Sequence, residues 1–126
     1  MRIPPKERPR RNRKNEALRA LVRENVLTSN DLIWPVFIKD GKGIREPIAS
    51  LPGCFRFSLD TLTSEIGPLM TLGLLAIALF PQIPEGQKDS LGIESFNENG
   101  LIPTSVRELK KQFPELIVIT DVALDP

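Results

Sequence analysis

The sequence predicts a protein of the α/β class with a mainly parallel sheet, preceded by an extended N-terminal arm. Three continuous apolar runs, residues 32–38, 74–80 and 116–124, are separated by segments with helical periodicity. None of the three runs alternates with polar residues. This pattern indicates strands that are covered on both faces, as in parallel sheets flanked by helices.

The arm comes first. Residues 1–14 hold three of the twelve prolines and seven basic residues, with no apolar periodicity, so they have no core of their own. From residue 15 to residue 24, apolar side chains recur at helical spacing behind Asn15, which predicts a short amphipathic helix with Asn15 as its N-cap. We therefore assign residues 1–30 to the arm and short helix, and residues 31–126 to the body.

The first strand, residues 32–38, contains Pro35, which cannot donate to a ladder and predicts a bulge or an irregular end there. Residues 39–53 are rich in turn residues. Residues 60–72 predict a helix that ends before Gly73, with a kink or break at Pro68, because an interior proline costs about 3 kcal/mol.

The second strand, residues 74–80, is followed by a loop and by a helix that starts after Asn99 and Gly100 and stops before Pro114. The third strand is broken by Asp121. The strand starts repeat about every 42 residues, so eight such units would need about 340 residues, the size of a (β/α)₈ TIM barrel. An open doubly wound sheet has the same order, but the first strand lacks the glycine-rich turn typical of it. We therefore expect a partial TIM barrel, its first three strands, which cannot close by themselves.

Charge divides the chain in two. Residues 1–23 carry nine basic and two acidic side chains, a net charge of +7. The other residues carry eight basic and fourteen acidic side chains, a net charge of −6. Such an arm suits a nucleic-acid or membrane contact, an acidic surface on a sister subunit, or a solvated tail. The body shows neither a basic face nor any tyrosine for base stacking, so we expect no nucleic-acid partner.

Several kinds of chemistry are excluded within this stretch. Histidine is absent, and Cys54 is the only cysteine, so neither an internal disulfide nor a thiolate zinc cluster can form. No apolar run reaches the roughly 18 residues of a membrane span, and no secretory leader is evident, so we expect a cytoplasmic protein without a membrane partner.

In a barrel, catalytic groups lie at the carboxyl ends of strands, where Asp121 and Asp125 follow the third strand. This carboxylate pair suits a cation or an ammonium group. Alternatively, Asp121 caps the strand or pairs with a lysine, and Asp125 starts a turn. Weaker candidates are Lys39 and Asp40 after the first strand, and the loop charges Glu85, Lys88, Asp89 and Glu94.

Six segments, taken together, resemble the porphobilinogen synthase (5-aminolevulinate dehydratase) family in order and spacing. They read RPRRNRKNEALRALVREN, NDLIWPVFI, EPIASLPGCFRFSLD, GLLAIALFP, NENGL and FPELIVITDVALDP. The resemblance covers essentially the whole chain. It implies a TIM barrel whose N-terminal arm wraps a neighbouring subunit in a homo-octamer. It also implies the condensation of two molecules of 5-aminolevulinate to porphobilinogen in tetrapyrrole synthesis.

The resemblance also assigns roles to residues. Asp121 matches the family's active-site aspartate, and Asp125 and Ala123 stand where zinc-using members have cysteines. It therefore implies the aspartate-rich type, in which Mg²⁺ or K⁺ replaces zinc, and this replacement agrees with the preference of hard cations for carboxylate oxygen. The two lysines that form Schiff bases lie on later strands, so we expect this chain alone to be inactive. The rival readings are a small binding protein that uses its basic arm, and an assembly or interference subunit.

Overall fold

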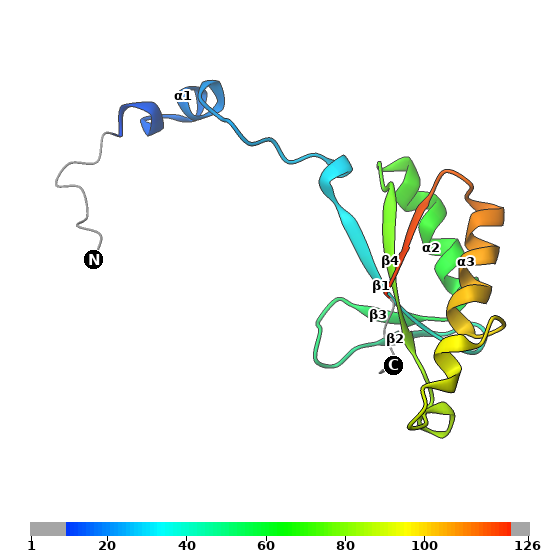
Figure 1. Ribbon diagram of the computed structural model, residues 1–126. Helices are drawn as coiled ribbons and strands as arrows, with labels where there is room; N and C mark the ends of the chain where they lie inside the picture. The colour runs from blue at the N-terminus through cyan, green and yellow to red at the C-terminus, as the bar shows by residue number, and fades with distance from the viewer. Residues whose placement is uncertain (1–9, 122–126) are drawn as a thin grey trace, which may run out of the picture.

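The computed structural model describes residues 10–121, as an N-terminal arm that leads into an α/β body (Figure 1). The arm contains the 3₁₀ turn η1 (Arg11–Arg13) and the helix α1 (Glu16–Leu21), and a second 3₁₀ turn, η2 (Ser29–Asp31), leads into the sheet. The predicted cap of α1 is confirmed, because Asn15 Oδ1 accepts a hydrogen bond from the Leu18 N–H at 2.9 Å. The boundary predicted at residue 30 falls inside η2.

Five strands form one sheet in the order β2-β3-β1-β4-β5. Their bounds are β1 (Ile33–Lys39), β2 (Arg45–Pro47), β3 (Phe55–Phe57), β4 (Ala76–Gln82) and β5 (Ile117–Thr120). Strand β1 pairs in parallel with β3 and β4, and β4 pairs in parallel with β5. The three predicted strands are thus present as adjacent parallel strands, which confirms the α/β class.

The sequence pattern indicates only turns over residues 39–53, and the structure differs there. Strands β2 and β3 form an antiparallel hairpin, and β3 joins the sheet beside β1 at Phe37 and Ile38. Each of the two strands is three residues long, REP and FRF, which is too short for a two-residue period to be recognised. The hairpin brings three charged side chains to the sheet, Arg45, Glu46 and Arg56, which the sequence pattern did not connect with a site.

The helices α2 (Leu59–Thr71) and α3 (Leu101–Gln112) cover the same face of the sheet (Figure 1). Between them and the sheet lies a core of fully or nearly fully buried side chains: Val36, Ile38, Phe57, Leu62, Ile66, Ile77, Leu79, Leu109 and Leu116. Gly73 follows α2 with φ of 97°, the left-handed conformation predicted for this position. A Cβ there would lie 2.6 Å from Ser29 Oγ, so the glycine also allows η2 to approach the end of α2.

The predicted bulge at Pro35 and the predicted break at Pro68 are wrong. Pro35 sits in an unbroken parallel register with β4, opposite Ala78, and no bulge occurs. It is tolerated because β3 pairs with β1 only from Phe37 onward, so at Pro35 the strand has a free edge. Pro68 does not break α2, which continues to Thr71. Because Pro68 has no N–H, the Ser64 carbonyl loses its helical hydrogen-bond donor. Both residues are exposed, so water can donate to that carbonyl instead.

The second face of the sheet carries no helix in the described part of the chain (Figure 1). Side chains that alternate with the core residues remain partly exposed there: Ile33 (53%), Phe80 (37%), Ile117 (56%) and Ile119 (39%). We call this surface the open face. The rings of Phe37 and Phe80 lie across it with centroids 5.8 Å apart.

Candidate functional site

The carboxyl ends of β1, β4 and β5 meet at one edge of the sheet, because the three strands are parallel. Lys39 at the end of β1 lies in register with Gln82 at the end of β4. Asp121 follows directly after Thr120, the last residue of β5, and is exposed. We call this end of the sheet the carboxyl edge; in α/β sheets it is the usual place for ligands and catalytic groups.

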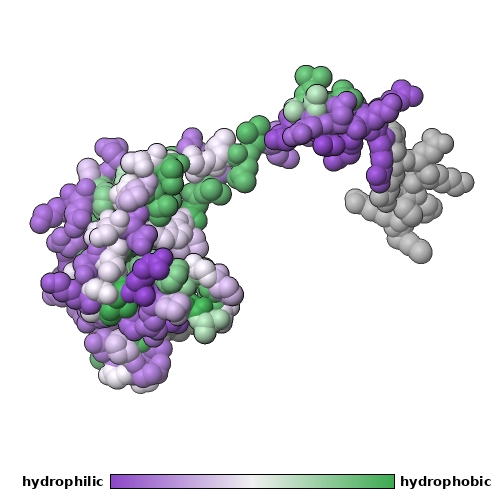
Figure 2. Space-filling view, turned by 180° about the vertical axis from the view of Figure 1, so that it is seen from behind, coloured by the Kyte–Doolittle hydropathy of each residue, from purple (hydrophilic) through white to green (hydrophobic). Residues whose placement is uncertain are grey.

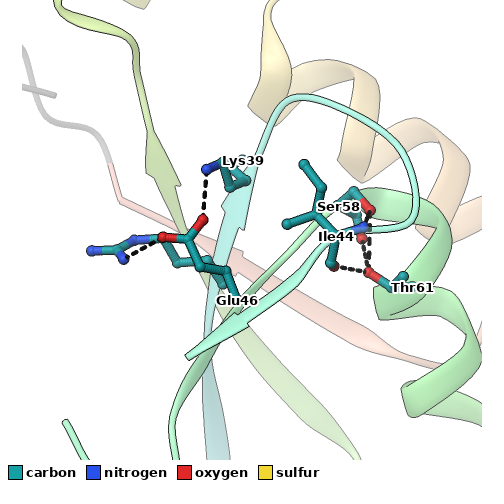
Figure 3. A network of polar contacts seen from close by, with 6 residues as sticks. Lys39, Ile44, Glu46, Ser58 and Thr61 are labelled. Atoms are coloured by element: carbon teal, nitrogen blue, oxygen red, sulfur yellow. Dashed lines mark hydrogen bonds and ion pairs between the residues drawn. The ribbon is translucent and has the colours of Figure 1, made fainter. Parts of the chain in front are cut away.

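A chain of ion pairs lies on the open face at the carboxyl edge. Lys39 Nζ is 2.7 Å from Glu46 Oε2, and Arg56 Nη1 is 3.5 Å from Glu46 Oε1. The hydrogen bond from Lys39, together with its positive charge, holds the pKa of Glu46 below its ordinary value. Figure 3 shows Lys39 and Glu46 on one side of the strands and Ser58 on the other, so this network is separate from the helix-covered core.

A second polar network fixes the loop that follows β1. The Ile44 N–H donates to Ser58 Oγ at 2.8 Å, and the Gly43 N–H donates to Asp60 Oδ2 at 2.9 Å. Ser58 Oγ in turn donates to Asp60 Oδ1 at 2.5 Å, and Thr61 Oγ1 donates to the Ile44 carbonyl (Figure 3). The hydrogen bonds from Ser58 and from Gly43 lower the pKa of Asp60. The loop at residues 40–44 is thereby attached to the first turn of α2.

A cavity of about 340 Å³ lies at the carboxyl ends of β1 and β4, next to the first turn of α3, and Gln82, Asn99 and Thr104 are among its lining residues. The buried Ser105 also lines it, and its hydroxyl has no hydrogen-bond partner among the described residues. The carboxylate of Glu94 lies against the start of α3, since a Cβ on Gly100 would come 2.7 Å from Glu94 Oε1. The negative charge of Glu94 therefore lies at the positive, N-terminal end of the α3 dipole.

The structure brings together only some of the residues that the sequence singled out. Lys39 and Asp121 share the carboxyl edge, and Asp40 and Glu94 line the cavity beside it. Lys88 pairs with Glu85 at 3.0 Å on the exposed loop after β4, and Asp89 accepts the backbone N–H groups of Leu91 and Ile93 in the same loop. These last contacts stabilise the loop itself.

Asp125 and Ala123 lie outside the described residues, so the role of Asp125 as a metal ligand stays a prediction, as does the catalytic role of Asp121. Within residues 10–121, no three side chains of the metal-binding types come together. Glu46 and Arg56 were missed because the two short strands that carry them were not recognised. The only signal in the sequence was that these two three-residue segments, REP and FRF, contain side chains of opposite charge, Glu46 and Arg56.

Together, the fold and the carboxyl edge define an α/β protein whose parallel sheet presents polar side chains where its strands end. Sequence comparison gives the particular family. The model of the family described as "Delta-aminolevulinic acid dehydratase" matches residues 6–126. The chain belongs to the delta-aminolevulinic acid dehydratase family.

Relatives at high identity agree. Delta-aminolevulinic acid dehydratase of Bradyrhizobium diazoefficiens is 52% identical over 119 residues, which are 94% of this chain and 34% of that protein. The Chlamydia pneumoniae protein of the same name is 51% identical over 94% of this chain and 36% of its own length. The chain therefore spans about a third of the length of these relatives.

A solved structure is similar in fold as well as in sequence. The delta-aminolevulinic acid dehydratase (porphobilinogen synthase) of Toxoplasma gondii, in complex with the reaction product porphobilinogen, superposes with a TM-score of 0.86 at 41% identity. The match covers 96% of this chain and 34% of that one.

No helix in residues 10–121 is long and apolar enough to cross a membrane.

Proposed function

We propose that this chain is part of a porphobilinogen synthase, which condenses two molecules of 5-aminolevulinate, with loss of water, to porphobilinogen in tetrapyrrole synthesis. The observation that carries this proposal is the family match over residues 6–126, which includes Asp121 at the carboxyl edge. The bound product in the Toxoplasma gondii relative supports the same reaction. We place the protein in the cytoplasm.

The architecture that fits this function is a TIM barrel, of which β1, β4 and β5 are the first three strands. In a barrel, helices cover the outer surface, and one face of every strand points inward. The open face, with its exposed Ile117 and Ile119, supports this assignment, because an inward surface would be covered by the remaining strands. The carboxyl edge then becomes part of the mouth of the barrel.

The chemistry assigned to this chain rests on Asp121. A carboxylate at the mouth can orient the ammonium group of the substrate and stabilise a cationic Schiff base by its charge. The Schiff bases themselves need two lysines, which the family resemblance places on later strands. The described chain therefore supplies an electrostatic group and part of the site wall, and the remaining two-thirds of the protein supplies the nucleophiles.

The cofactor we propose is Mg²⁺, or K⁺ in its place, with no zinc. Of the two positions where zinc-using members carry cysteines, Ala123 offers no ligand and Asp125 offers a carboxylate. Carboxylate oxygen is the donor that hard cations prefer, and it is a poor substitute for thiolate at a structural or catalytic zinc. The cation would supply positive charge beside the substrate, and Asp125 would hold it.

We further propose a homo-octamer held by the N-terminal arm. Large apolar side chains of the arm are exposed: Leu21 (81%), Val26 (69%) and Leu27 (77%). Figure 2 shows hydrophobic residues exposed along the segment that joins α1 to the sheet. A surface of this kind on a soluble protein is typical of an interface, and a neighbouring subunit would cover it.

The test uses a full-length graft, in which this chain replaces the matching 119 residues of the Bradyrhizobium diazoefficiens enzyme. We expect the graft to form porphobilinogen from 5-aminolevulinate. Asp121→Asn should then lower kcat about 100-fold or more, because a positioned charge is lost while the shape is kept. The control is Glu115→Gln, which removes an exposed carboxylate away from the carboxyl edge. A folded, assembled graft without activity, or an Asp121→Asn variant as active as the control, would contradict the proposal.

A further inference from the structure

The cavity of about 340 Å³ beside the first turn of α3 has unused hydrogen-bonding groups in its wall. We call it the α3 cavity. Its wall comes from the loop after β1, the first residue of α2, the loop after β4 and the start of α3, and it includes the buried residues Ile83 (9% exposed), Gly100 and Ser105 (1%). Asp121 is not among its lining residues, so the cavity is distinct from the carboxylate on which the proposed reaction rests.

Hydrogen-bond donors at the start of α3 have no acceptor in the described chain. The cap residue, Gly100, has no side chain that could accept from the first turn, and Pro103 has no N–H. The N–H of Leu101, which lines the cavity, donates to no group within residues 10–121. The buried hydroxyl of Ser105, one turn further along, is also without a partner there. An unsatisfied buried polar group costs free energy, which a ligand would recover.

Two carboxylates in the same wall keep a free oxygen. Glu94 Oε2 accepts from Asn97 Nδ2 at 3.0 Å, and Asp40 Oδ1 accepts a backbone N–H at 2.9 Å. The second oxygen of each carboxylate has no hydrogen-bond partner within the described residues. Glu94 Oε1 would lie 2.7 Å from a Cβ on Gly100, the residue before Leu101. A free acceptor and a free donor therefore lie close together at the start of α3.

The charges around the α3 cavity disfavour an ionic ligand. Among the described lining residues Lys39 alone is basic, and its ammonium group is paired with Glu46 at 2.7 Å. Glu94 and Asp40 would repel an anion. A cation would satisfy these carboxylates, but it would face the positive end of the α3 dipole and leave the Leu101 N–H without an acceptor. A neutral ligand that both donates and accepts suits all of these groups.

We propose that the α3 cavity binds a neutral sugar through adjacent hydroxyl groups. A hydroxyl can accept from an N–H and donate to a carboxylate at the same time, which neither a carbonyl nor an ammonium group can do. Leu59 and Ile83 in the wall offer an apolar surface to the C–H groups of a sugar ring. The volume lies at the lower end of the range of small-molecule sites, which suits a single ring.

The test is saturation-transfer difference NMR on the full-length graft with D-glucose, with porphobilinogen present to occupy the site of the proposed reaction. We expect D-glucose to bind. Cyclohexanol, a ring of the same size with a single hydroxyl, should bind more weakly, because it lacks adjacent hydroxyls. D-glucuronate should also bind more weakly than D-glucose, because its carboxylate meets Glu94 and Asp40.

Two variants locate the binding. Ser105→Ala should weaken the binding of D-glucose about fivefold, the usual effect of losing one neutral hydrogen bond. Ser64→Ala is its matched control, because Ser64 lies on α2 and does not line the cavity. Glu94→Gln should weaken D-glucose binding and strengthen D-glucuronate binding, since repulsion is removed. Glu98→Gln removes the same charge from the same loop outside the cavity and should change neither affinity by more than about twofold.

Absence of D-glucose binding in the assembled graft would overturn the proposal, as would equal losses in Ser105→Ala and Ser64→Ala. Equal binding of cyclohexanol would contradict recognition through adjacent hydroxyls. D-glucosamine is the cationic probe: binding more than about tenfold tighter than that of D-glucose would assign the cavity to a cation instead. Failure of the proposed reaction appears as a lack of porphobilinogen formation, so the two results are read separately.

Discussion

Ser58→Ala should release the loop after β1 without unfolding the sheet. The Ser58 side chain is fully buried (0% exposed) and connects residues 40–44 with the start of α2. Its hydroxyl accepts the Ile44 N–H at 2.8 Å and donates to Asp60 Oδ1 at 2.5 Å. Alanine removes both bonds and leaves the Ile44 N–H without an acceptor.

The expected size follows from what remains in the variant. Leaving a buried donor unsatisfied costs about 1–3 kcal/mol. The Ser58 N–H still donates to the Ile44 carbonyl at 3.1 Å, and Thr61 Oγ1 still donates to the same carbonyl. The Gly43 N–H still donates to Asp60 Oδ2 at 2.9 Å, so the loop keeps three of its attachments. We therefore expect the free energy of local opening to fall by about 2 kcal/mol, which raises the equilibrium constant for opening of this loop about 30-fold.

Amide hydrogen exchange in the full-length graft measures this opening directly. The Ile44 amide should exchange about 30-fold faster in Ser58→Ala, while amides of β4 keep their rates. Ser64→Ala is the matched control, because Ser64 lies on the exposed side of α2 and donates only to the Asp60 carbonyl, at 3.2 Å. Unchanged exchange at Ile44, or an equal change in the control, would refute the role of Ser58 as the connection.

Further predictions concern the same elements. Asp60 has a lowered pKa, so its contribution to stability is present above its unfolded-state pKa and lost as the pH falls through the folded one; melting temperature between pH 5 and pH 2 should fall less in Asp60→Asn than in the parent. Gly100→Ala places a Cβ 2.7 Å from Glu94 Oε1 and 3.0 Å from the Asn97 carbonyl, and should cost about 1–2 kcal/mol in urea unfolding, whereas Gly67→Ala meets nothing within 4 Å and should stabilise α2 by about 0.5–1 kcal/mol. The graft should keep its activity in a zinc-selective chelator and gain activity with Mg²⁺; restoration by zinc alone would count against the Asp125 assignment. Residues 1–126 alone should form no porphobilinogen and no stoichiometric borohydride-trapped adduct with 5-aminolevulinate, and should aggregate through the open face, which light scattering and mass analysis would check.

The parts of the fold that the sequence predicted are those with long, strongly patterned segments. Three continuous apolar runs and two amphipathic stretches were sufficient to predict β1, β4, β5, α2 and α3. The hairpin of β2 and β3 was missed because its strands are three residues long and are stabilised by pairing with β1 rather than by a local pattern. The prolines were misjudged for a related reason: whether an N–H is needed at Pro35 depends on which neighbour lies beside it, and sequence periodicity does not contain that information.

The site was predicted only in part. The position of Asp121 at the end of a strand follows from the apolar run before it. The ion pairs of Glu46 with Lys39 and Arg56 depend on a cross-strand register that only the structure provides. Likewise, the contact between α1 and η1, in which Arg19 Nη1 donates to the Arg13 carbonyl at 3.3 Å, was not predicted, whereas the sequence revealed that the arm is basic.

Two lysines of this chain, Lys39 and Lys110, make contacts that do not suit the nucleophile of the proposed reaction. A Schiff base forms only when a neutral amine, with a free lone pair, attacks a ketone. The lysine nearest to Asp121 in the sheet, Lys39, donates to Glu46 at 2.7 Å, and Lys110 donates to the carbonyls of Pro114 and Leu116 at 2.5 and 2.8 Å. Both nitrogens are used as hydrogen-bond donors. A reactive lysine instead needs an apolar or cationic surrounding, and the open face, with Phe37, Phe80 and Ile119, provides an apolar wall toward which a lysine of a later strand could point. In the proposed reaction, the described residues would contribute part of the environment, and we expect the attacking lysines on the later strands that the family resemblance implies.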